Sequence, residues 1–186
     1  VRCGNPEHKR IMEIYKDKSV SPEKRAKDLL EKMTVTEKIN QMHVWLNIPP
    51  ALKDAEKDQD FVPFGFMFNI KAISPSDIES LQRHAVEKSR LGIPIMFMGE
   101  GLHGLLHPNA TVFPQSLGLS CSFDTELVNE IATEIGKMAS AGGFNQLFAP
   151  DLDLVRDPRW GRVQETYGED PFLVGELGSA YIEGLQ

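Results

Sequence analysis

Short apolar runs that alternate with amphipathic segments constrain the fold of this chain more than any other feature of its sequence. The runs lie at residues 42–46, 64–68, 93–98 and 144–149, and each is shorter than an ordinary buried helix. A continuously apolar strand is typical of a parallel sheet, because crossover helices bury both of its faces. The alternation therefore predicts an α/β fold built from parallel strand–helix units.

The segments between these runs carry the signals that begin helices. Each predicted helix follows a residue whose side chain can cap it, namely Ser21, Thr34, Ser74, Asp124 or Ser122, and Asp170. Glu37, three residues after Thr34, completes a capping-box pattern, and the glycines at 142–143 are expected to end the fourth helix. The residues expected to face inward are Ala26, Leu29, Leu30, Met33, Val35, Ile39, Met42, Ile78, Leu81, Ala85, Leu127, Ile131, Ile135, Met138, Leu173, Leu177 and Tyr181.

The number of units bounds the architecture. About four strand–helix units fit into 186 residues, whereas a closed (β/α)8 barrel takes about 250 residues, so about half of such a barrel is expected if the barrel is the correct architecture. A doubly wound sheet remains open on these patterns alone. Repeats, low-complexity tracts and Gly/Ser linkers are not seen, so we expect an N-terminal extension at 1–20 and one undivided unit at 21–186.

Composition excludes several classes of protein. The net charge of −7 supplies no basic face for nucleic acid, and no window approaches the roughly 18 apolar residues of a membrane span. Cys3 and Cys121 can form one bridge at most, and we expect two unrelated thiols rather than a disulfide scaffold. The start at Val1 has no apolar core of a signal peptide, so we expect a processed or trimmed start. Dinucleotide fingerprints, P-loops and structural-zinc motifs are missing from the sequence.

Residues that follow the third and fourth predicted strands are the first candidates for chemistry, because ligands of parallel α/β proteins bind at the carboxyl ends of strands. Glu100 follows the third strand between two glycines and is placed to accept hydrogen bonds from ligand hydroxyls, although a structural acid is an alternative. His103 is either hydrogen-bonded in the loop or in contact with substrate. Glu100, His103 and His107 could also hold a metal, but Pro108 and the glycines argue against a helix that presents them together.

The segment 150–171 follows the fourth strand and interleaves three arginines with acids, an aromatic residue and glycines. Arginine fixes planar, bidentate contacts, so some of these pairs are expected to hold the loop itself together. A guanidinium and a carboxylate that arrive from adjacent strand ends could together grip vicinal sugar hydroxyls, one donating and the other accepting.

The same residues carry a resemblance. The run Arg156-Asp157-Pro158-Arg159-Trp160-Gly161-Arg162, continued through Glu165 to 168–171, resembles the signature stretch of glycoside hydrolase family 3, the β-glucosidase and β-xylosidase family. Segments 32–39, 99–104 and 111–115 are similar to the same family in the same order, so the resemblance covers about residues 20–186.

The resemblance implies the opening part of the family's N-terminal (β/α)8-like barrel, in an enzyme that releases non-reducing-end β-linked sugars with retention. Glu100 matches the family's acid that accepts from sugar hydroxyls, and Arg162 matches the arginine that donates to the same sugar. We expect β-glucosidase activity, with β-xylosidase as the alternative because glutamate at this position is more frequent in that branch. The remaining motif residues are expected to support the loop so that Arg162 points into the pocket: Arg156, Asp157, Arg159, Trp160 and Glu165.

The chemistry of retention needs two carboxylates about 5–5.5 Å apart, and no cofactor or metal. The resemblance implies that the nucleophile, the acid/base and a sugar-binding Lys-His pair lie beyond Gln186, so no catalytic residue is expected within this chain. The 186 residues alone are therefore expected to be inactive and to need the second half of the barrel and a following domain. A secreted or periplasmic location and a β-linked oligosaccharide or aryl glycoside substrate are expected for the enzyme. A non-catalytic carbohydrate-binding or structural fragment is the alternative of another class.

Overall fold

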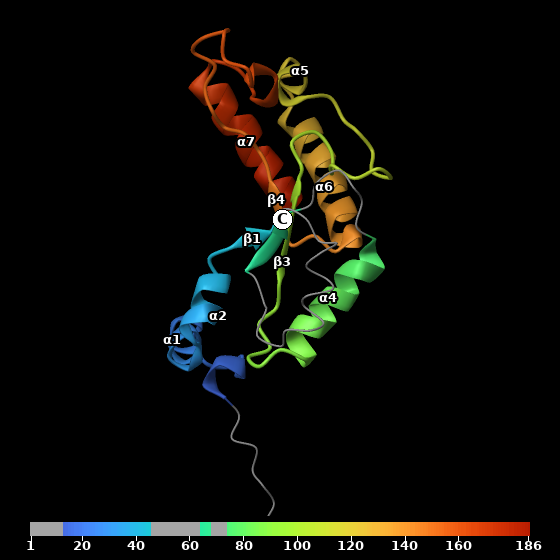
Figure 1. Cartoon of the computed structure of the whole chain (residues 1–186). Helices are drawn as coiled ribbons and strands as arrows, with labels where there is room; N and C mark the ends of the chain where they lie inside the picture. The colour runs from blue at the N-terminus through green and yellow to red at the C-terminus, as the bar shows by residue number, and fades with distance from the viewer. Residues whose placement is uncertain (1–12, 46–63, 68–73) are drawn as a thin grey trace, which may run out of the picture.

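The fold is a four-stranded parallel sheet with helices packed around it, as seen in a computed structural model that describes residues 13–45, 64–67 and 74–186 (Figure 1). Cys3 and the last residues of the predicted apolar runs 42–46 and 64–68 lie outside the described residues. In chain order the elements are η1 (Ile14–Lys16), α1 (Pro22–Lys32), α2 (Val35–Asn40), β1 (Val44–Trp45), β2 (Gly65–Met67), α4 (Pro75–Glu87), β3 (Met96–Glu100), α5 (Ser116–Ser120), α6 (Thr125–Gly142), β4 (Gln146–Phe148), η2 (Val163–Glu165) and α7 (Pro171–Leu185).

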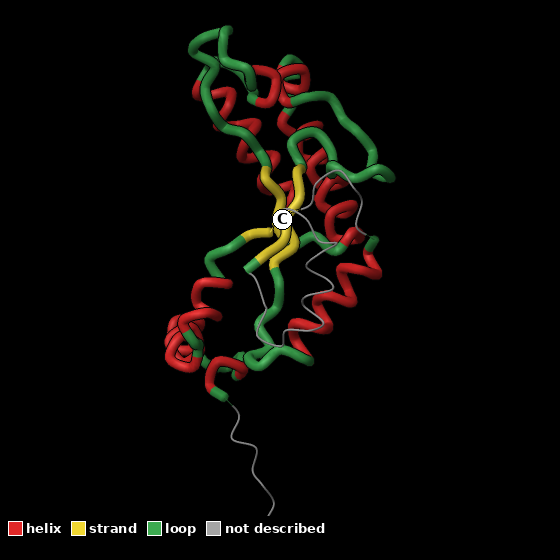
Figure 2. Tube along the Cα trace, viewed as in Figure 1, coloured by secondary structure: helices red, strands yellow, loops and turns green. Residues whose placement is uncertain are grey.

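The order of the strands decides between the two architectures that the sequence left open. β1, β2, β3 and β4 pair in sequential order, and every pair is parallel. A doubly wound sheet reverses its strand order at a switch point, whereas a barrel adds each strand beside the previous one. The strand order is therefore that of a (β/α)8 barrel, the architecture that the family resemblance implied, and the four strands agree with the expected half of it. Figure 2 shows the strands in the middle of the molecule, between helices on either side.

Local capping signals predicted the helix starts correctly. Thr34 Oγ1 accepts from the Glu37 backbone N–H at 3.2 Å, and Glu37 Oε2 accepts from the Thr34 N–H at 2.7 Å, which completes the capping box of α2. Ser74 begins α4 with the same arrangement. Asp124 rather than Ser122 caps α6, through the Leu127 N–H at 3.0 Å.

The main core lies between α6 and α7, which run side by side in Figure 1. On α6, Ile135 is fully buried as predicted, and Ile131 and Met138 are partly buried against the same core. Leu127 is 38% exposed, whereas the neighbouring Val128 is fully buried, because the face that packs against α7 is turned slightly from the predicted one. Gly136 permits the close approach, because a Cβ there would lie 3.0 Å from the Leu185 carbonyl oxygen.

The prediction that the apolar face of α2 turns inward is wrong for the described structure. Val35 is 72% exposed, Ile39 49% and Met42 83%, and Leu30 on α1 is 53% exposed. Among the described residues, α1 packs chiefly against η1, and the packing around α2 leaves this face exposed. Amphipathic spacing identifies the apolar side of a helix, but a neighbouring element has to bury it.

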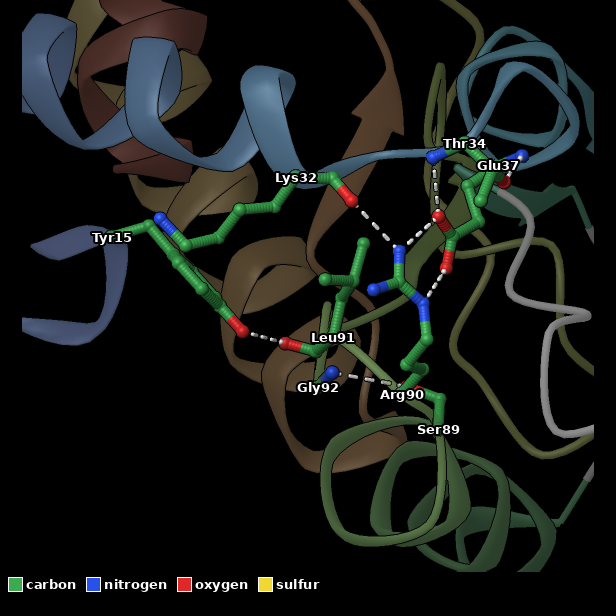
Figure 3. Close-up of polar contacts among 8 residues, drawn as sticks. All are labelled: Tyr15, Lys32, Thr34, Glu37, Ser89, Arg90, Leu91 and Gly92. Atoms are coloured by element: carbon green, nitrogen blue, oxygen red, sulfur yellow. Dashed lines mark hydrogen bonds and ion pairs between the residues drawn. The ribbon is translucent and has the colours of Figure 1, made fainter. Parts of the chain in front are cut away.

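The amino-terminal end of the sheet holds a group of polar contacts that we call the base cluster: Thr34, Glu37, Arg90 and the Lys32 carbonyl (Figure 3). Arg90 donates to Glu37 through Nε, at 2.9 Å from Oε1, and through Nη2, at 2.5 Å from Oε2. Arg90 Nη2 also donates to the Lys32 carbonyl at 2.9 Å. The Arg90 guanidinium holds the pKa of Glu37 below its ordinary value, although burial of that carboxylate acts in the opposite direction.

Tyr15 extends the contacts of this end of the molecule. Its side chain is buried, and its hydroxyl donates to the Leu91 carbonyl at 2.8 Å (Figure 3). Its backbone N–H donates to Asp28 on α1 at 3.1 Å. Tyr15 belongs to the segment 1–20 expected as an extension, and these contacts attach residues 14–16 to α1 and to the loop before β3.

Candidate sugar-binding pocket at the strand ends

The loops that follow β3 and β4 leave the same edge of the sheet and run toward α5 and the start of α7 (Figure 1). Glu100 is the last residue of β3, two positions later than the predicted strand end, and it pairs in register with Phe148 on β4. Asp151 lies three residues after Phe148. Adjacent parallel strands therefore bring two carboxylates to one edge of the sheet.

Glu100 is partly buried at this edge. Burial raises the pKa of its carboxyl, the nearby Arg162 charge opposes that rise, and Glu165 adds to it. The side chain of Glu100 accepts no hydrogen bond from any residue in the described parts of the chain. Glu100 is thus a carboxylate whose hydrogen-bonding capacity is available to a ligand.

Arg162 stands at the start of η2, in the loop after β4. Its Nε donates to Glu165 Oε2 at 2.8 Å, and its Nη2 also bonds to that oxygen. Asp151 Oδ2 lies 3.6 Å from Arg162 Nη2, which is an ion pair but is too long for a hydrogen bond. The hydrogen bonds that Arg162 donates to Glu165 raise the pKa of the Arg162 guanidinium, which is cationic in any case.

A pocket of about 700 Å³ joins these groups, and we call it the strand-end pocket. Glu100, Asp151 and Arg162 supply charged groups to its wall, and Leu102, Phe148 and Leu152 supply apolar surface. The volume lies in the range of small-molecule sites. The structure thus brings together Glu100 and Arg162, the two residues that the sequence nominated as ligand contacts, although they lie in different loops.

His103 does not line this pocket. It lines a smaller cavity of about 200 Å³, which it shares with Glu100, Leu102 and Val112. Its Nδ1 is buried and has no hydrogen-bond partner among the described residues. His107 and His103 do not join Glu100 in a group that could hold a metal ion, as judged from residues 13–45, 64–67 and 74–186.

The other motif residues occupy the outer part of the loop. Asp157 binds Arg159 through both carboxylate oxygens, with Arg159 Nε at 3.0 Å from Oδ1, and the Arg159 side chain is 89% exposed. Trp160 is 36% exposed, and Arg156 is exposed without an ion pair in the described part of the chain. The loop therefore contains the internal ion pairs that the density of charges predicted.

Two further residues at this edge were not singled out in the sequence. Asp151 lies just after β4, at the carboxyl end of a parallel strand, where ligands of α/β proteins bind. Its position in the sequence could therefore have identified it as a candidate, as it did for Glu100. Tyr181 on α7 is buried, and its hydroxyl donates to the Gly101 carbonyl, next to Glu100. This contact joins positions 80 apart, and no local pattern predicts it.

A cavity of about 630 Å³ lies elsewhere, among α6, the end of α7 and the start of β4. Lys137 is the only charged side chain on its described lining. It therefore lacks the pairing of a carboxylate with a guanidinium that the strand-end pocket offers to a polyhydroxylated ligand.

Comparisons with known proteins agree on one family. Residues 34–186 match the Glycosyl hydrolase family 3 N terminal domain. The chain is 35% identical, over 181 residues, to the periplasmic beta-glucosidase of Salmonella typhimurium, an alignment that covers 93% of this chain and 22% of that enzyme. It is 42% identical over 115 residues to a beta-xylosidase of Formosa agariphila, covering 59% of this chain and 16% of that one.

Solved structures give the same result. A β-glucosidase from Erythrobacter marinus superposes with a TM-score of 0.82 at 34% identity, over 94% of this chain and 24% of that one. A mutant β-glucosidase from Listeria innocua in complex with laminaribiose superposes with a TM-score of 0.72 at 37% identity, over 89% and 24%. The chain thus spans about a quarter of these relatives. Among its described residues, no helix combines the length and apolar character that a membrane crossing requires. The match over residues 34–186 shows that this chain belongs to glycosyl hydrolase family 3 and carries part of the (β/α)8 barrel that forms the family's N-terminal domain.

Proposed function

We propose that this chain forms part of a retaining exo-β-glycosidase of the β-glucosidase type, and that the strand-end pocket binds the non-reducing-end sugar. The observation that carries the proposal is the placement of Glu100 and Arg162 on the wall of one pocket of about 700 Å³. A carboxylate accepts and a guanidinium donates, so the pair suits vicinal sugar hydroxyls, which do both. Relatives named as β-glucosidases support the choice of activity.

The substrate proposed is a β-linked oligosaccharide or an aryl β-glycoside. A Listeria innocua relative has been solved with laminaribiose and with glucose. β-Xylosidase activity is the second candidate, and the 42% identity to a Formosa agariphila beta-xylosidase favours it. A periplasmic or secreted location is proposed because one relative is named as periplasmic.

The catalytic activity that we propose is that of a family 3 enzyme, and this chain matches only part of such enzymes. Retention needs a nucleophilic carboxylate and an acid/base residue. We propose that neither lies within residues 1–186, so the role proposed for this chain is binding and orienting the sugar. We assign no catalytic residue within it and no cofactor.

Titration of the 186-residue chain with D-glucose and with D-xylose, followed by NMR chemical shifts, tests the proposal. Glu100→Gln and Arg162→Met should each weaken binding of the preferred sugar at least tenfold, because each removes a charged hydrogen-bond partner. Arg159→Met is the matched control, since Arg159 lies on the same loop but outside the pocket. Its affinity should equal that of the unmodified chain.

Equal affinities for all three variants would overturn the assignment of the pocket. The sugar that binds more tightly decides between glucosidase and xylosidase. Release of nitrophenol from β-glucoside and β-xyloside substrates provides the second measurement. Sugar binding without turnover by the 186-residue chain is the expected result, whereas turnover would show that a nucleophile lies within it.

A further inference from the structure

Asp151 places a deeply buried carboxylate on the wall of the strand-end pocket. Its side chain is 9% exposed, compared with 57% for Arg162 and 22% for Glu165. Its Oδ1 accepts from the Asp153 backbone N–H at 3.1 Å. Its Oδ2 is buried and has no hydrogen-bond donor within reach in the described parts of the chain. A buried carboxylate oxygen without a donor is costly, so its position calls for an explanation.

The group nearest to this oxygen is the Arg162 guanidinium, 3.6 Å away. Arg162 lies between two carboxylates, with Glu165 hydrogen-bonded to it at 2.8 Å and Asp151 on the pocket side. Glu165 does not line the pocket. Glu165 therefore attracts the guanidinium away from the pocket, whereas Asp151, and more weakly Glu100, attract it toward the pocket.

The backbone fixes this geometry. Asp151 forms an isolated parallel bridge with Thr166, which is fully buried and directly follows Glu165. The residue that carries the free oxygen is therefore fastened to the segment that carries the guanidinium and its other partner. The backbone bridge fixes the position of the short Asp151 side chain. Of the two charged groups, only the Arg162 guanidinium is carried by a long side chain.

We propose that Asp151 is a positioning residue, whose carboxylate holds the Arg162 guanidinium over the strand-end pocket so that its N–H groups can donate to a ligand hydroxyl. The inference rests on the proposed function for the identity of the ligand, a neutral sugar. The proposed function itself assigned no role to Asp151. Asp151 acts through the charge on Arg162 and makes no contact with the ligand of its own.

Two substitutions separate charge from shape. Asp151→Asn keeps the size and the acceptor for the Asp153 N–H but removes the charge, so binding of D-glucose and D-xylose should weaken about three- to tenfold. Asp151→Glu keeps the charge and lengthens the side chain by one methylene, so it should retain more of the affinity than Asp151→Asn. The reverse order, with Asn tolerated and Glu not, would show that the site needs only the shape of Asp151 and would overturn the proposal.

An NMR measurement on the ligand-free chain tests the positioning role of Asp151 independently of the proposed function. The Nε–Hε NMR signal of Arg162 should shift in Asp151→Asn and remain near its original position in Asp151→Glu. Asp157→Asn is the matched control, because Asp157 also binds an arginine on this loop but lies outside the pocket. It should move the signal of Arg159 and leave that of Arg162 unchanged.

A double substitution establishes whether Asp151 acts through Arg162. In an Arg162→Met background, Asp151→Asn should change sugar affinity less than twofold, because the group it positions is gone. A full additive loss would mean that Asp151 contacts the sugar directly, and would overturn the positioning role. If no variant binds either sugar, the proposed function fails, and the Arg162 signal alone still decides the inference.

Discussion

The two ends of the sheet each bring an arginine to a carboxylate, and they use the pair differently. In the base cluster, Arg90 makes two hydrogen bonds to Glu37 and one to the Lys32 carbonyl, and the Thr34 N–H completes the shell. In the strand-end pocket, Arg162 is 57% exposed, and Asp151 Oδ2 has no donor within the described residues. Both carboxylate oxygens of Glu37 thus accept hydrogen bonds, whereas one carboxylate oxygen of Asp151 accepts none within the described residues.

The pKa values of two glutamates report the same difference. Arg90 lowers the pKa of Glu37, whereas burial raises the pKa of Glu100. A carboxylate with its hydrogen bonds made is stabilised in its charged form, and one that is desolvated without partners is not. In barrel folds the amino ends of strands serve stability and the carboxyl ends serve ligands. The two glutamates show how that division arises from hydrogen bonds.

The largest expected effect is on the free energy of unfolding, when arginine is replaced by methionine at one end of the sheet or at the other. Arg90→Met leaves the buried Glu37 carboxylate without its cation and should lower the free energy of unfolding by about 2–3 kcal/mol. Arg162→Met removes a mostly exposed side chain and should change the urea midpoint far less. Urea unfolding of both variants, with their m-values compared, measures the difference. Equal losses would remove the distinction between the two ends.

A smaller effect should follow from deleting a tyrosine hydroxyl at each end. Tyr15 donates to the Leu91 carbonyl near the base cluster, and Tyr181 donates to the Gly101 carbonyl beside Glu100. Tyr15→Phe and Tyr181→Phe should each cost about 1 kcal/mol of stability, because each leaves a carbonyl without its donor. Only Tyr181→Phe should also weaken sugar binding. Thermal unfolding and the sugar titration together test this, and a binding defect in Tyr15→Phe would contradict it.

The smallest effect should appear in the pH dependence of stability. The lowered pKa of Glu37 contributes stability above its unfolded value of about 4.5, which is lost as pH falls through the folded pKa. The raised pKa of Glu100 has the opposite sign: its contribution is complete below about 4.5 and is lost as pH rises through the folded pKa.

The free energies of unfolding of Glu100→Gln and of the unmodified chain should therefore be equal below about pH 4. At pH 7 the variant should be slightly more stable. Glu37→Gln should behave in reverse, with its deficit largest at pH 7 and smaller in acid. A curve for Glu100→Gln that lies below the unmodified chain at pH 7 would mean that its carboxylate has a partner after all.

Much of the fold could be predicted because its signals are local. The capping pairs Thr34 with Glu37 and Ser74 with Asp77 lie within one helical turn, so their spacing alone predicted two helix starts. The proximity of the loops that carry Glu100 and Arg162 followed from one rule about parallel strands. The buried face of α6 was predicted correctly at Ile135 and wrongly at Leu127, because helical spacing fixes the period of a stripe better than its exact direction.

The sequence by itself determined the alternation of strands and helices, the helix caps and the family, since each is written in residues close together along the chain. Only the tertiary structure decided that Arg90 closes on Glu37, 53 positions away, and that Asp151 keeps a buried oxygen beside Arg162. It also decided that the apolar face of α2 is exposed among the described residues. The physical reason is that burial and ion pairing depend on which distant segments meet, and short-range patterns do not encode those meetings.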